Sequence, residues 1–350
     1  MDRLFETWLE EGMISRPAYL NLMGDGSRRN SSSAEDGRWK FSILISTYRR
    51  SDYLIRLLNS IKNQQYHNYE IIIVDDASDD DTGDRVKQYR AENTELNIVY
   101  LVNERNLGVS ESRKRAYLKP SGDIIIFVDD DDYYIDPGYF STLNQLYEEH
   151  PDCTMTVAPT IQYFEQKGKY EYRGLNTPKT MSSRVYLNDF KKYTNPHLFA
   201  VSMKNTVLKQ VHYEELLFFN HISLLLFELL GEGNVYTIKQ AVGIRTFHNG
   251  NITGNTTAEF IIANMESKED IYRRAMAAGL LDHPKEWRYR HLSGTAGYHF
   301  ANIRKITSKD TIIFDWMRKH FERADYIRFI AMIIKTRSKR WLRVRLGFRK

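Results

Sequence analysis

The fold of this 350-residue chain is decided by the stretch Asp123-Ile124-Ile125-Ile126-Phe127-Val128-Asp129-Asp130-Asp131-Asp132. An apolar run without polar alternation is typical of a strand that is buried on both faces of a sheet. Four aspartates follow this strand directly. Their carboxylates repel one another unless a cation or solvent reduces the repulsion. The pattern predicts an acidic site at the edge of a sheet, and the alternative is a solvated acidic loop.

Three more apolar runs precede this strand, and each is followed by a segment that reads as a helix, the first of them with Leu54, Leu57, Leu58 and Ile61 at helical spacing. The runs cover residues 41–46, 69–74 and 96–102, and the helices cover residues 51–65, 82–93 and 109–119. Strands that alternate with helices indicate a parallel sheet covered on both faces. With right-handed crossovers, the sequence predicts an α/β fold with a Rossmann-like, doubly wound first half.

The composition fits a globular protein and excludes several other classes. The chain is 42% hydrophobic and 27% charged, and its formal charge of +5 does not by itself indicate nucleic-acid binding. Its one cysteine, Cys153, rules out a disulfide within the chain. The polar N-terminus does not read as a signal peptide, and the apolar runs are too short to cross a bilayer. We therefore expect a cytoplasmic protein.

Polar residues gather where three of the predicted strands end. The first strand ends in Ser46-Thr47-Tyr48-Arg49-Arg50, the second in Asp75-Asp76, and the fourth in the aspartate run. The carboxyl ends of parallel strands share one edge of the sheet, so these residues should meet there. Carboxylates with nearby arginine suit a nucleotide diphosphate and a divalent metal. This half has neither a Walker lysine loop nor a G-x-G-x-x-G sequence, which argues against P-loop NTPases and dinucleotide dehydrogenases.

Four ordered blocks carry a resemblance to a known family. They are ISTYRR (45–50), IIIVDDASDDDT (71–82), NERNLGVSESRKRA (103–116) and SGDIIIFVDDDDYYIDPGY (121–139). In this order they resemble the nucleotide-binding half of a family 2 glycosyltransferase with the GT-A fold. The resemblance covers about residues 41–140 and implies a mostly parallel sheet flanked by helices.

The resemblance implies roles for the residues after the first two strands. Thr47, Tyr48 and Arg49 match the segment that lies along the nucleoside. Asp75 or Asp76 matches the acid that hydrogen-bonds the base, usually uracil. Two structural alternatives stay open: Thr47 and Tyr48 could cap the first helix, and Asp76 could form an Asx turn.

The remaining donor-site roles fall on Arg113 and the aspartate run. Arg113 matches a basic residue near the donor, although an exposed helix position would also suit an arginine. Asp129-Asp130-Asp131 matches the D-x-D motif, and Asp132 matches the acid that often follows it. The resemblance implies that Asp131 or Asp132 binds Mn²⁺ or Mg²⁺, and that Asp129 or Asp130 faces the ribose.

The chain departs from the family pattern at the catalytic base. The acidic pair expected before an apolar helix falls on Asn220-His221. With a pKa of about 6.5, a histidine such as His221 is partly a free base near neutral pH, and it is our candidate. A packed histidine at a helix start is the alternative, and Glu214, Glu215 and Glu228 are rival bases.

His248 is a candidate metal ligand. It lies in the turn-rich segment Arg245-Thr246-Phe247-His248-Asn249-Gly250, where related enzymes often have a histidine close to the metal or the diphosphate. A neutral imidazole can join carboxylates on Mn²⁺. The alternative is an ordinary loop histidine.

The C-terminus is basic. Residues 335–350 contain no acid and eight basic residues, which are Lys335, Arg337, Lys339, Arg340, Arg343, Arg345, Arg349 and Lys350. Basic residues interleaved with Trp341, Leu342 and Phe348 fit an anionic membrane surface better than nucleic acid. A solvated tail is the alternative.

These observations predict three regions. Residues 1–38 form a helix and a flexible linker, and residues 39–255 form the GT-A domain, with a nucleotide-binding half (39–150) and an acceptor half (151–255). Residues 256–350 are helical, with helices expected at 256–279, 284–305 and 309–335. The last region is expected to shape the acceptor site, to hold the enzyme at a membrane, or to join subunits of a homo-oligomer.

The resemblance implies a metal-dependent, inverting glycosyltransferase. Its donor would be a nucleotide-diphosphate sugar, with UDP favoured, and its acceptor a hydroxyl of a glycan or a lipid-linked sugar. We expect it at the inner face of a bacterial membrane, in cell-surface polysaccharide synthesis. The alternatives are a non-catalytic sugar-nucleotide binding protein and a sugar nucleotidyltransferase. The second usually has a glycine-rich loop after the first strand, and STYRRSDYL (46–54) has no glycine.

Overall fold

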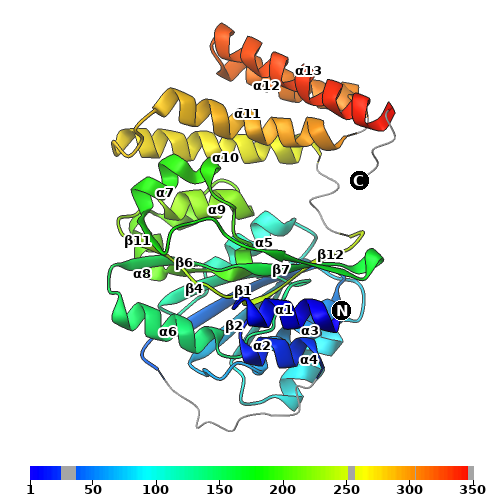
Figure 1. Ribbon diagram of the computed structural model, residues 1–350, viewed down its shortest axis with the longest axis vertical. Helices are drawn as coiled ribbons and strands as arrows, with labels where there is room; N and C mark the ends of the chain where they lie inside the picture. The colour runs from blue at the N-terminus through cyan, green and yellow to red at the C-terminus, as the bar shows by residue number, and fades with distance from the viewer. Residues whose placement is uncertain (25–36, 251–256, 304, 346–350) are drawn as a thin grey trace. The chain divides into compact units, whose positions relative to one another are not determined.

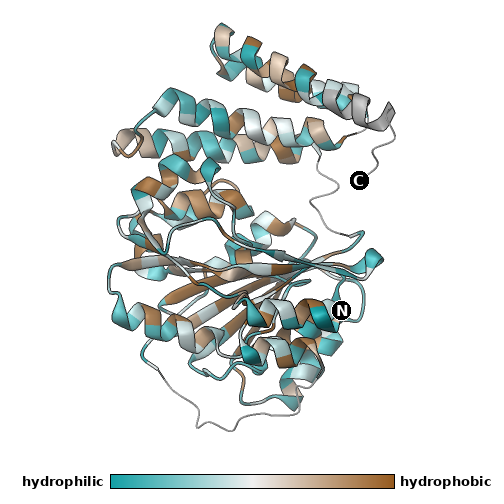
Figure 2. Ribbon diagram, in the orientation of Figure 1, coloured by the Kyte–Doolittle hydropathy of each residue, from teal (hydrophilic) through white to brown (hydrophobic). Residues whose placement is uncertain are grey.

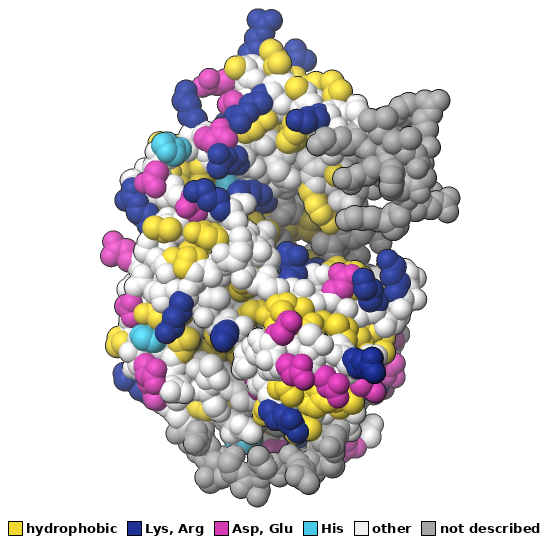
Figure 3. Space-filling model, viewed as in Figure 1, with side chains coloured by type: hydrophobic (Ala, Val, Ile, Leu, Met, Phe, Trp, Pro, Cys, Tyr) yellow, Lys and Arg dark blue, Asp and Glu magenta, His cyan; other side chains and the backbone are white. Residues whose placement is uncertain are grey.

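The computed structural model describes residues 1–24, 37–250, 257–303 and 305–345, with side chains up to residue 338 (Figure 1). The chain separates into two compact units, Met1–His248 and Asn249–Lys350. The predicted linker and the last part of the basic tail lie outside the described residues. On the first unit, acidic and basic side chains are interspersed on the side in view (Figure 3), in keeping with the modest net charge.

The first unit is built on a mixed eight-stranded sheet with the order β3-β2-β1-β4-β10-β6-β11-β9. The first four strands in this order are parallel, whereas β10 runs antiparallel to both of its neighbours. Figure 2 shows that the central strands are hydrophobic along most of their length. The predicted α/β fold is confirmed, with strands β1 (Phe41–Thr47), β2 (Tyr69–Asp75), β3 (Ile98–Val102), β4 (Ile124–Asp129), β6 (Cys153–Val157), β9 (Thr180–Ser182), β10 (Val201–Lys204) and β11 (Asn234–Thr237).

Helices cover both faces of this sheet, as strands without polar alternation require. On one face, Leu54, Val86 and Phe140 belong to a core that includes Phe41 and Ile126 of the strands. On the other face, the rings of Tyr117, Tyr213 and Phe219 pack around Phe127 of β4. The helices are α3 (Ser51–Lys62), α4 (Thr82–Glu92), α5 (Val109–Tyr117), α6 (Tyr139–Glu149), α7 (Ser183–Asp189), α8 (Asn205–Gln210) and α9 (His221–Glu228).

A second, four-stranded sheet has the order β5-β12-β7-β8, with β5 (Tyr133–Tyr134), β12 (Gly243–Phe247), β7 (Thr160–Phe164) and β8 (Lys169–Arg173). Two N-terminal helices, α1 (Asp2–Glu10) and α2 (Arg16–Leu22), bury Phe5 and Trp8 against Ile161 and Ile244 of this sheet. The compact fold therefore includes these helices instead of beginning near Trp39. Their apolar faces are covered by strands that lie more than 130 residues later in the sequence.

The second unit is helical, as expected, with α10 (Ala258–Ala277), α11 (Pro284–Asn302), α12 (Thr311–His320) and α13 (Arg323–Arg345). The single helix expected at 309–335 is instead two helices. The backbone of Phe321 is extended, and its side chain is buried with Met317 and Phe329 in the helical core, so the chain folds back there. Of the helices that the structure describes, none combines the length and the apolar content that crossing a bilayer requires.

Glu228, at the end of α9, is fully buried, and neither of its carboxyl oxygens has a hydrogen-bond partner among the described residues. Burial raises its pKa from 4.5 to about 8, against the opposing influence of the Thr154 hydroxyl. Because the folded chain holds this proton more tightly than the unfolded chain does, stability falls as the pH rises from 4.5 to 8.

Replacing Glu228 with glutamine should therefore flatten the dependence of stability on pH. The ionisation penalty that it removes is about 3 kcal/mol at pH 7. Urea unfolding at pH 5, 7 and 8 measures this effect, with Glu232→Gln at an exposed position as the control. Equal pH slopes in the native chain and the Glu228 variant would show that this carboxyl ionises freely in the folded state.

Candidate active site

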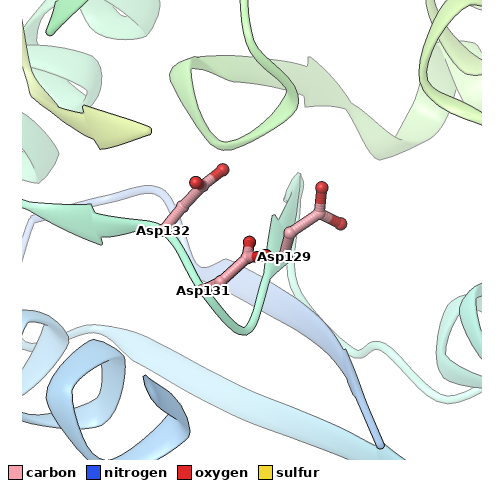
Figure 4. Close-up of side chains that lie close together, drawn as sticks. All are labelled: Asp129, Asp131 and Asp132. Carbon is pink, nitrogen blue, oxygen red and sulfur yellow. The ribbon is translucent and has the colours of Figure 1, made fainter. Parts of the chain in front are cut away.

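Three aspartates converge in the turn between β4 and β5. One carboxylate oxygen from each of Asp129, Asp131 and Asp132 lies within 4.8 Å of the other two. The backbone N–H of Asp132 donates to the carbonyl of Asp129 at 3.1 Å, which closes the turn. Figure 4 shows the three side chains on the same side of this turn. Three oxygen donors in so small a space fit a divalent cation such as Mn²⁺ or Mg²⁺.

The pKa values of two carboxyl groups in this turn are raised, because the turn is buried and neighbouring residues do not fully neutralise its negative charge. Burial, together with the charges of Asp131 and Asp129, raises the pKa of Asp132 well above its usual value. Burial also raises the pKa of Asp130 to about 6, against the opposing charge of Arg50. A bound cation relieves this kind of repulsion and favours the ionised carboxylates. The residues present therefore fit a metal site.

Two arginines hold the turn from the side of α3. The Nη1 of Arg50 donates to Asp130 Oδ1 at 3.0 Å and to Asp131 Oδ2 at 2.9 Å. The Nη2 of Arg56 donates to the backbone carbonyl of Asp131 at 2.7 Å and to the Thr246 hydroxyl at 2.9 Å. These contacts fix the loop between β4 and β5 against both α3 and β12.

His248 reaches the same cluster from the end of β12. Its Nε2 lies 2.9 Å from Asp131 Oδ2, and its ring stacks on Tyr53 of α3 with the ring centres 4.8 Å apart. The backbone N–H of Thr246, two residues earlier, donates to Asp132 Oδ1 at 3.2 Å. The segment after β12 thus places an imidazole beside the candidate metal ligands.

The sequence offered Asp129 and Asp130 as alternatives for the residue that faces the ribose. Their surroundings in the structure differ. The Asp130 side chain is 4% exposed, and it accepts hydrogen bonds from the Thr47 hydroxyl at 2.8 Å and from Arg50. The Asp129 side chain is 38% exposed and belongs to the acidic cluster. Asp130 therefore holds the turn against β1, and Asp129 is the more exposed of the two carboxylates.

Asp75 and Asp76 are buried at the end of β2 and have local partners. The carboxylate of Asp76 accepts the backbone N–H groups of Leu107 and Gly108 at 2.8 and 2.7 Å, as well as the side-chain amide of Asn103. The carboxylate of Asp75 accepts the Tyr100 hydroxyl at 2.5 Å and the N–H of Ser78 at 2.8 Å. Both acids shape the edge of the sheet by fixing the loops beside it.

Tyr48 and Arg49 lie in the loop after β1. The guanidinium of Arg49 pairs with Asp79, with an Nη2–Oδ2 distance of 2.7 Å, and lies over the ring of Tyr48. The backbone N–H of Arg49 donates to the Ser78 hydroxyl at 2.8 Å. These contacts join the loop after β1 to the loop after β2, so Thr47, Tyr48, Arg49 and Asp75 share one edge of the sheet, as predicted from the topology.

Arg113 links the acidic turn to the segment before α9. Its Nη2 forms an ion pair with Asp129, and its Nη1 donates to the backbone carbonyl of Phe219 at 3.1 Å. Burial opposes ionisation of Asp129, but the charge and the hydrogen bond of Arg113, together with the charge of Arg245, outweigh it, and the pKa of this carboxyl lies below its usual value. Asp129 is thereby kept ionised at the edge of the site.

His221 is the first residue of α9, behind the cap that Asn220 provides. Its Nε2 lies 2.6 Å from the carbonyl of Pro196, and because a carbonyl only accepts, this nitrogen carries a proton. Burial and the charge of Arg245 lower the pKa of His221 to about 4, against the opposing charge of Asp129. The ring is therefore neutral at pH 7, with the lone pair on Nδ1.

The rival bases lie in different surroundings. Glu214 faces His212, with 3.6 Å between Oε1 and Nδ1, and Glu215 is exposed beside it. Glu228 is fully buried at the other end of α9. Of these candidates, His221 is the one that interacts electrostatically with Asp129, since the charge of each residue shifts the pKa of the other.

Residues 42–217 match the family described as Glycosyl transferase family 2, which is half of the chain. The chain belongs to this family. The resemblance seen in its four sequence blocks is thus confirmed.

Several curated relatives match the glycosyltransferase region. Glycosyltransferase GlyA of Streptococcus pneumoniae is 30% identical over 133 residues, which are 38% of this chain and 18% of that protein. The putative teichuronic acid biosynthesis glycosyltransferase TuaG of Bacillus subtilis is 34% identical over 96 residues, 27% of this chain and 37% of the relative. The chain spans less than half of the length of these curated relatives.

Two solved structures share the fold over most of the chain. Residues 1–349 of Staphylococcus aureus TarS in complex with UDP-GlcNAc superpose with a TM-score of 0.61 at 18% identity, covering 88% of this chain and 92% of that one. Mannosyltransferase PcManGT of Pyrobaculum calidifontis, in complex with GDP-Man and Mn²⁺, gives 0.51 at 12% identity and covers 97% of both chains. At these identities the likeness establishes the GT-A fold of this family 2 glycosyltransferase.

No role followed from the sequence for three arginines near the family 2 site. Arg50 was predicted at the same edge of the sheet as the aspartates but not paired with them, and Arg56 lies on a predicted helix that only the folded chain brings to the turn. Arg245 lies next to Thr246, whose backbone bonds Asp132. The signal that could have found Arg50 is its place at the end of a strand, among residues already assigned to the site.

Proposed function

We propose that this chain is a metal-dependent, inverting glycosyltransferase that moves a sugar from a UDP-sugar to a hydroxyl of a glycan or lipid-linked acceptor. The convergence of Asp129, Asp131 and Asp132 at the carboxyl edge of the sheet carries this proposal. TarS in complex with UDP-GlcNAc and PcManGT in complex with GDP-Man and Mn²⁺ support it as proteins of the same fold.

The acidic turn is the proposed place of the donor diphosphate. Asp129, Asp131 and Asp132 would hold Mn²⁺ or Mg²⁺, with His248 as a further candidate ligand. When bound, the cation neutralises negative charge on the leaving diphosphate. Thr47, Tyr48, Arg49 and Asp75 border the nucleoside at the adjoining strand ends.

His221 acts as the base. Its neutral Nδ1 accepts the proton of the acceptor hydroxyl while the hydroxyl oxygen bonds to the anomeric carbon of the sugar. The bond from that carbon to the diphosphate oxygen breaks on the opposite side and takes its electron pair to the leaving group. This in-line displacement inverts the anomeric configuration. Arg113, paired with Asp129, stabilises the negative charge near the leaving group.

The acceptor belongs to a bacterial cell-surface polymer in this proposal. The names of the relatives support it, since TuaG is assigned to teichuronic acid biosynthesis and TarS of Staphylococcus aureus acts on poly(ribitol-phosphate). Synthesis of such a polymer places the enzyme at the inner face of the membrane. The basic tail proposed to bind that surface has described side chains only up to residue 338.

A thermal-shift and UDP-release assay tests the function. UDP-sugars and GDP-mannose are added to the purified chain with Mn²⁺ or with EDTA. A donor at a hundred times its Kd stabilises the folded state by about 2.7 kcal/mol, so the melting temperature should rise with a UDP-sugar and Mn²⁺ together. Stabilisation without release of UDP, with any acceptor supplied, would indicate a non-catalytic binding protein. No shift with any of these nucleotides would contradict the proposal.

A further inference from the structure

The second sheet has two chemically different faces, which the strand register separates. Ile161, Tyr172 and Ile244 lie on the face that packs against α1 and α2. The opposite face carries the alternate residues, because neighbouring side chains of a strand point to opposite sides. We call this opposite face the open face, and its side chains are those of Thr160, Gln162, Phe164, Lys169, Glu171, Arg173, Arg245 and Phe247.

The open face extends to the proposed reaction centre. Thr160 Oγ1 lies 2.9 Å from His197 Nδ1, and His197 follows Pro196, whose carbonyl accepts the hydrogen bond from His221. At the other strand, Arg245 precedes Thr246, whose backbone N–H bonds Asp132. A ligand on the open face therefore lies next to both the candidate base and the acidic turn.

Two arginines on the open face form no ion pair with a described acid, although the charge of Arg245 also acts on Asp129 and Asp132 of the acidic turn. Neither Arg173 nor Arg245 forms a hydrogen bond or an ion pair with another described residue, and the buried Nε of Arg173 is unsatisfied. The acid on this face, Glu171, is paired with Lys169 at 2.6 Å. Cations that are partly removed from water and unpaired are costly, so this arrangement favours an anionic ligand.

An aromatic pair adjoins these arginines. The rings of Phe164 and Phe247 are stacked with their centres 4.9 Å apart, and both are partly exposed. The guanidinium of Arg245 lies over the Phe247 ring, 4.8 Å from its centre. This cation–π contact orients Arg245, while the rings offer apolar surface beside the charge.

We propose that the open face binds the acceptor, and that the acceptor is an anionic glycan whose phosphate or carboxylate groups are bound by Arg173 and Arg245. The guanidinium fork matches both kinds of oxyanion. The donor diphosphate is proposed to bind at the acidic turn, so it does not supply the anionic partner that Arg173 lacks. That the ligand is a glycan follows from the proposed function, on which this inference rests.

Binding of three oligomers of equal length tests the inference, with UDP and Mn²⁺ present. The probes are a ribitol-phosphate oligomer, an oligogalacturonate and a neutral malto-oligosaccharide. We expect one of the anionic probes to bind at least about tenfold more tightly than the neutral one, and its affinity to fall with added salt. Comparison of the two anionic probes separates phosphate from carboxylate.

Variants assign the binding to the two arginines. Arg173→Gln and Arg245→Gln should each weaken binding of the anionic probe by about tenfold. The affinity for UDP should be unchanged in Arg173→Gln, because Arg173 lies outside the acidic turn. Lys209→Gln, at an exposed position of α8 outside the second sheet, is the control. Arg245→Lys, which keeps the charge but not the fork, should lose less than Arg245→Gln. Melting temperatures show that each variant is folded.

Three results would overturn the inference: equal binding of neutral and anionic probes, unchanged anionic binding in both glutamine variants, or a loss of UDP affinity in place of oligomer affinity. A native chain that binds UDP with Mn²⁺ but neither anionic probe contradicts this inference alone. A native chain that binds no nucleotide contradicts the proposed function.

Discussion

Replacing Asp132 with asparagine is expected to lower kcat/KM for sugar transfer by about a thousandfold, or roughly 4 kcal/mol of transition-state stabilisation. The variant loses one of three carboxylates that converge in the acidic turn. Its amide oxygen can still accept the Thr246 N–H, and the change removes a charge that the turn holds with difficulty. The metal-free variant should therefore be at least as stable as the native chain.

Two measurements on the same sample separate these effects. The melting temperature without metal should stay the same or rise, whereas the increase caused by Mn²⁺ and UDP should disappear. Asp84→Asn, at a position whose side chain is 87% exposed, is the control and should retain activity and the Mn²⁺ response. Full activity in the Asp132 variant would remove this residue from the proposed metal site.

Replacing His221 with alanine is expected to lower kcat by about a hundredfold to ten-thousandfold, the usual contribution of a general base. The affinity for UDP and Mn²⁺ should not change, because His221 lies outside the acidic turn and its Nε2 is engaged by Pro196. A base with a pKa of about 4 stays neutral across the neutral range. Such a base is weak, so it removes the hydroxyl proton late, after the acceptor oxygen has begun to bond to the sugar and the hydroxyl has become more acidic.

The pH profile and chemical rescue test this role. Since the neutral form is active, protonation of His221 should slow the native enzyme only as the pH drops towards 4. Added imidazole should restore part of the rate of the alanine variant, while His212→Asn, at an exposed histidine of the preceding segment, should behave as the native chain. A weaker UDP affinity with an unchanged kcat would show that His221 positions the donor instead.

The first half of the fold could be predicted because its information is local. Each of the strands β1 to β3 is a short apolar run followed directly by a helix, and β4 is an apolar run that ends at the aspartates. The rule that parallel strands end at one edge then brings Thr47, Asp75 and the aspartate turn together without any knowledge of contacts. The structure places these residues there, with Thr47 hydrogen-bonded to Asp130.

The rest depends on contacts between distant parts of the chain. Arg56 bonds Thr246 across 190 positions of sequence, and no spacing rule links the two. In the same way, Trp8 becomes a core residue only because β7 and β8 form a sheet to receive it. The segment around Asp76 shows a further limit, since the sequence could not show that its carboxylate accepts the N–H groups of Leu107 and Gly108.

The most direct test is a crystal of the chain grown with UDP and Mn²⁺, with diffraction recorded at the manganese absorption edge. We predict an anomalous peak within coordination distance of carboxylate oxygens of Asp129, Asp131 and Asp132, in contact with the diphosphate. A peak elsewhere, or bound UDP with no peak at this turn, would contradict the account.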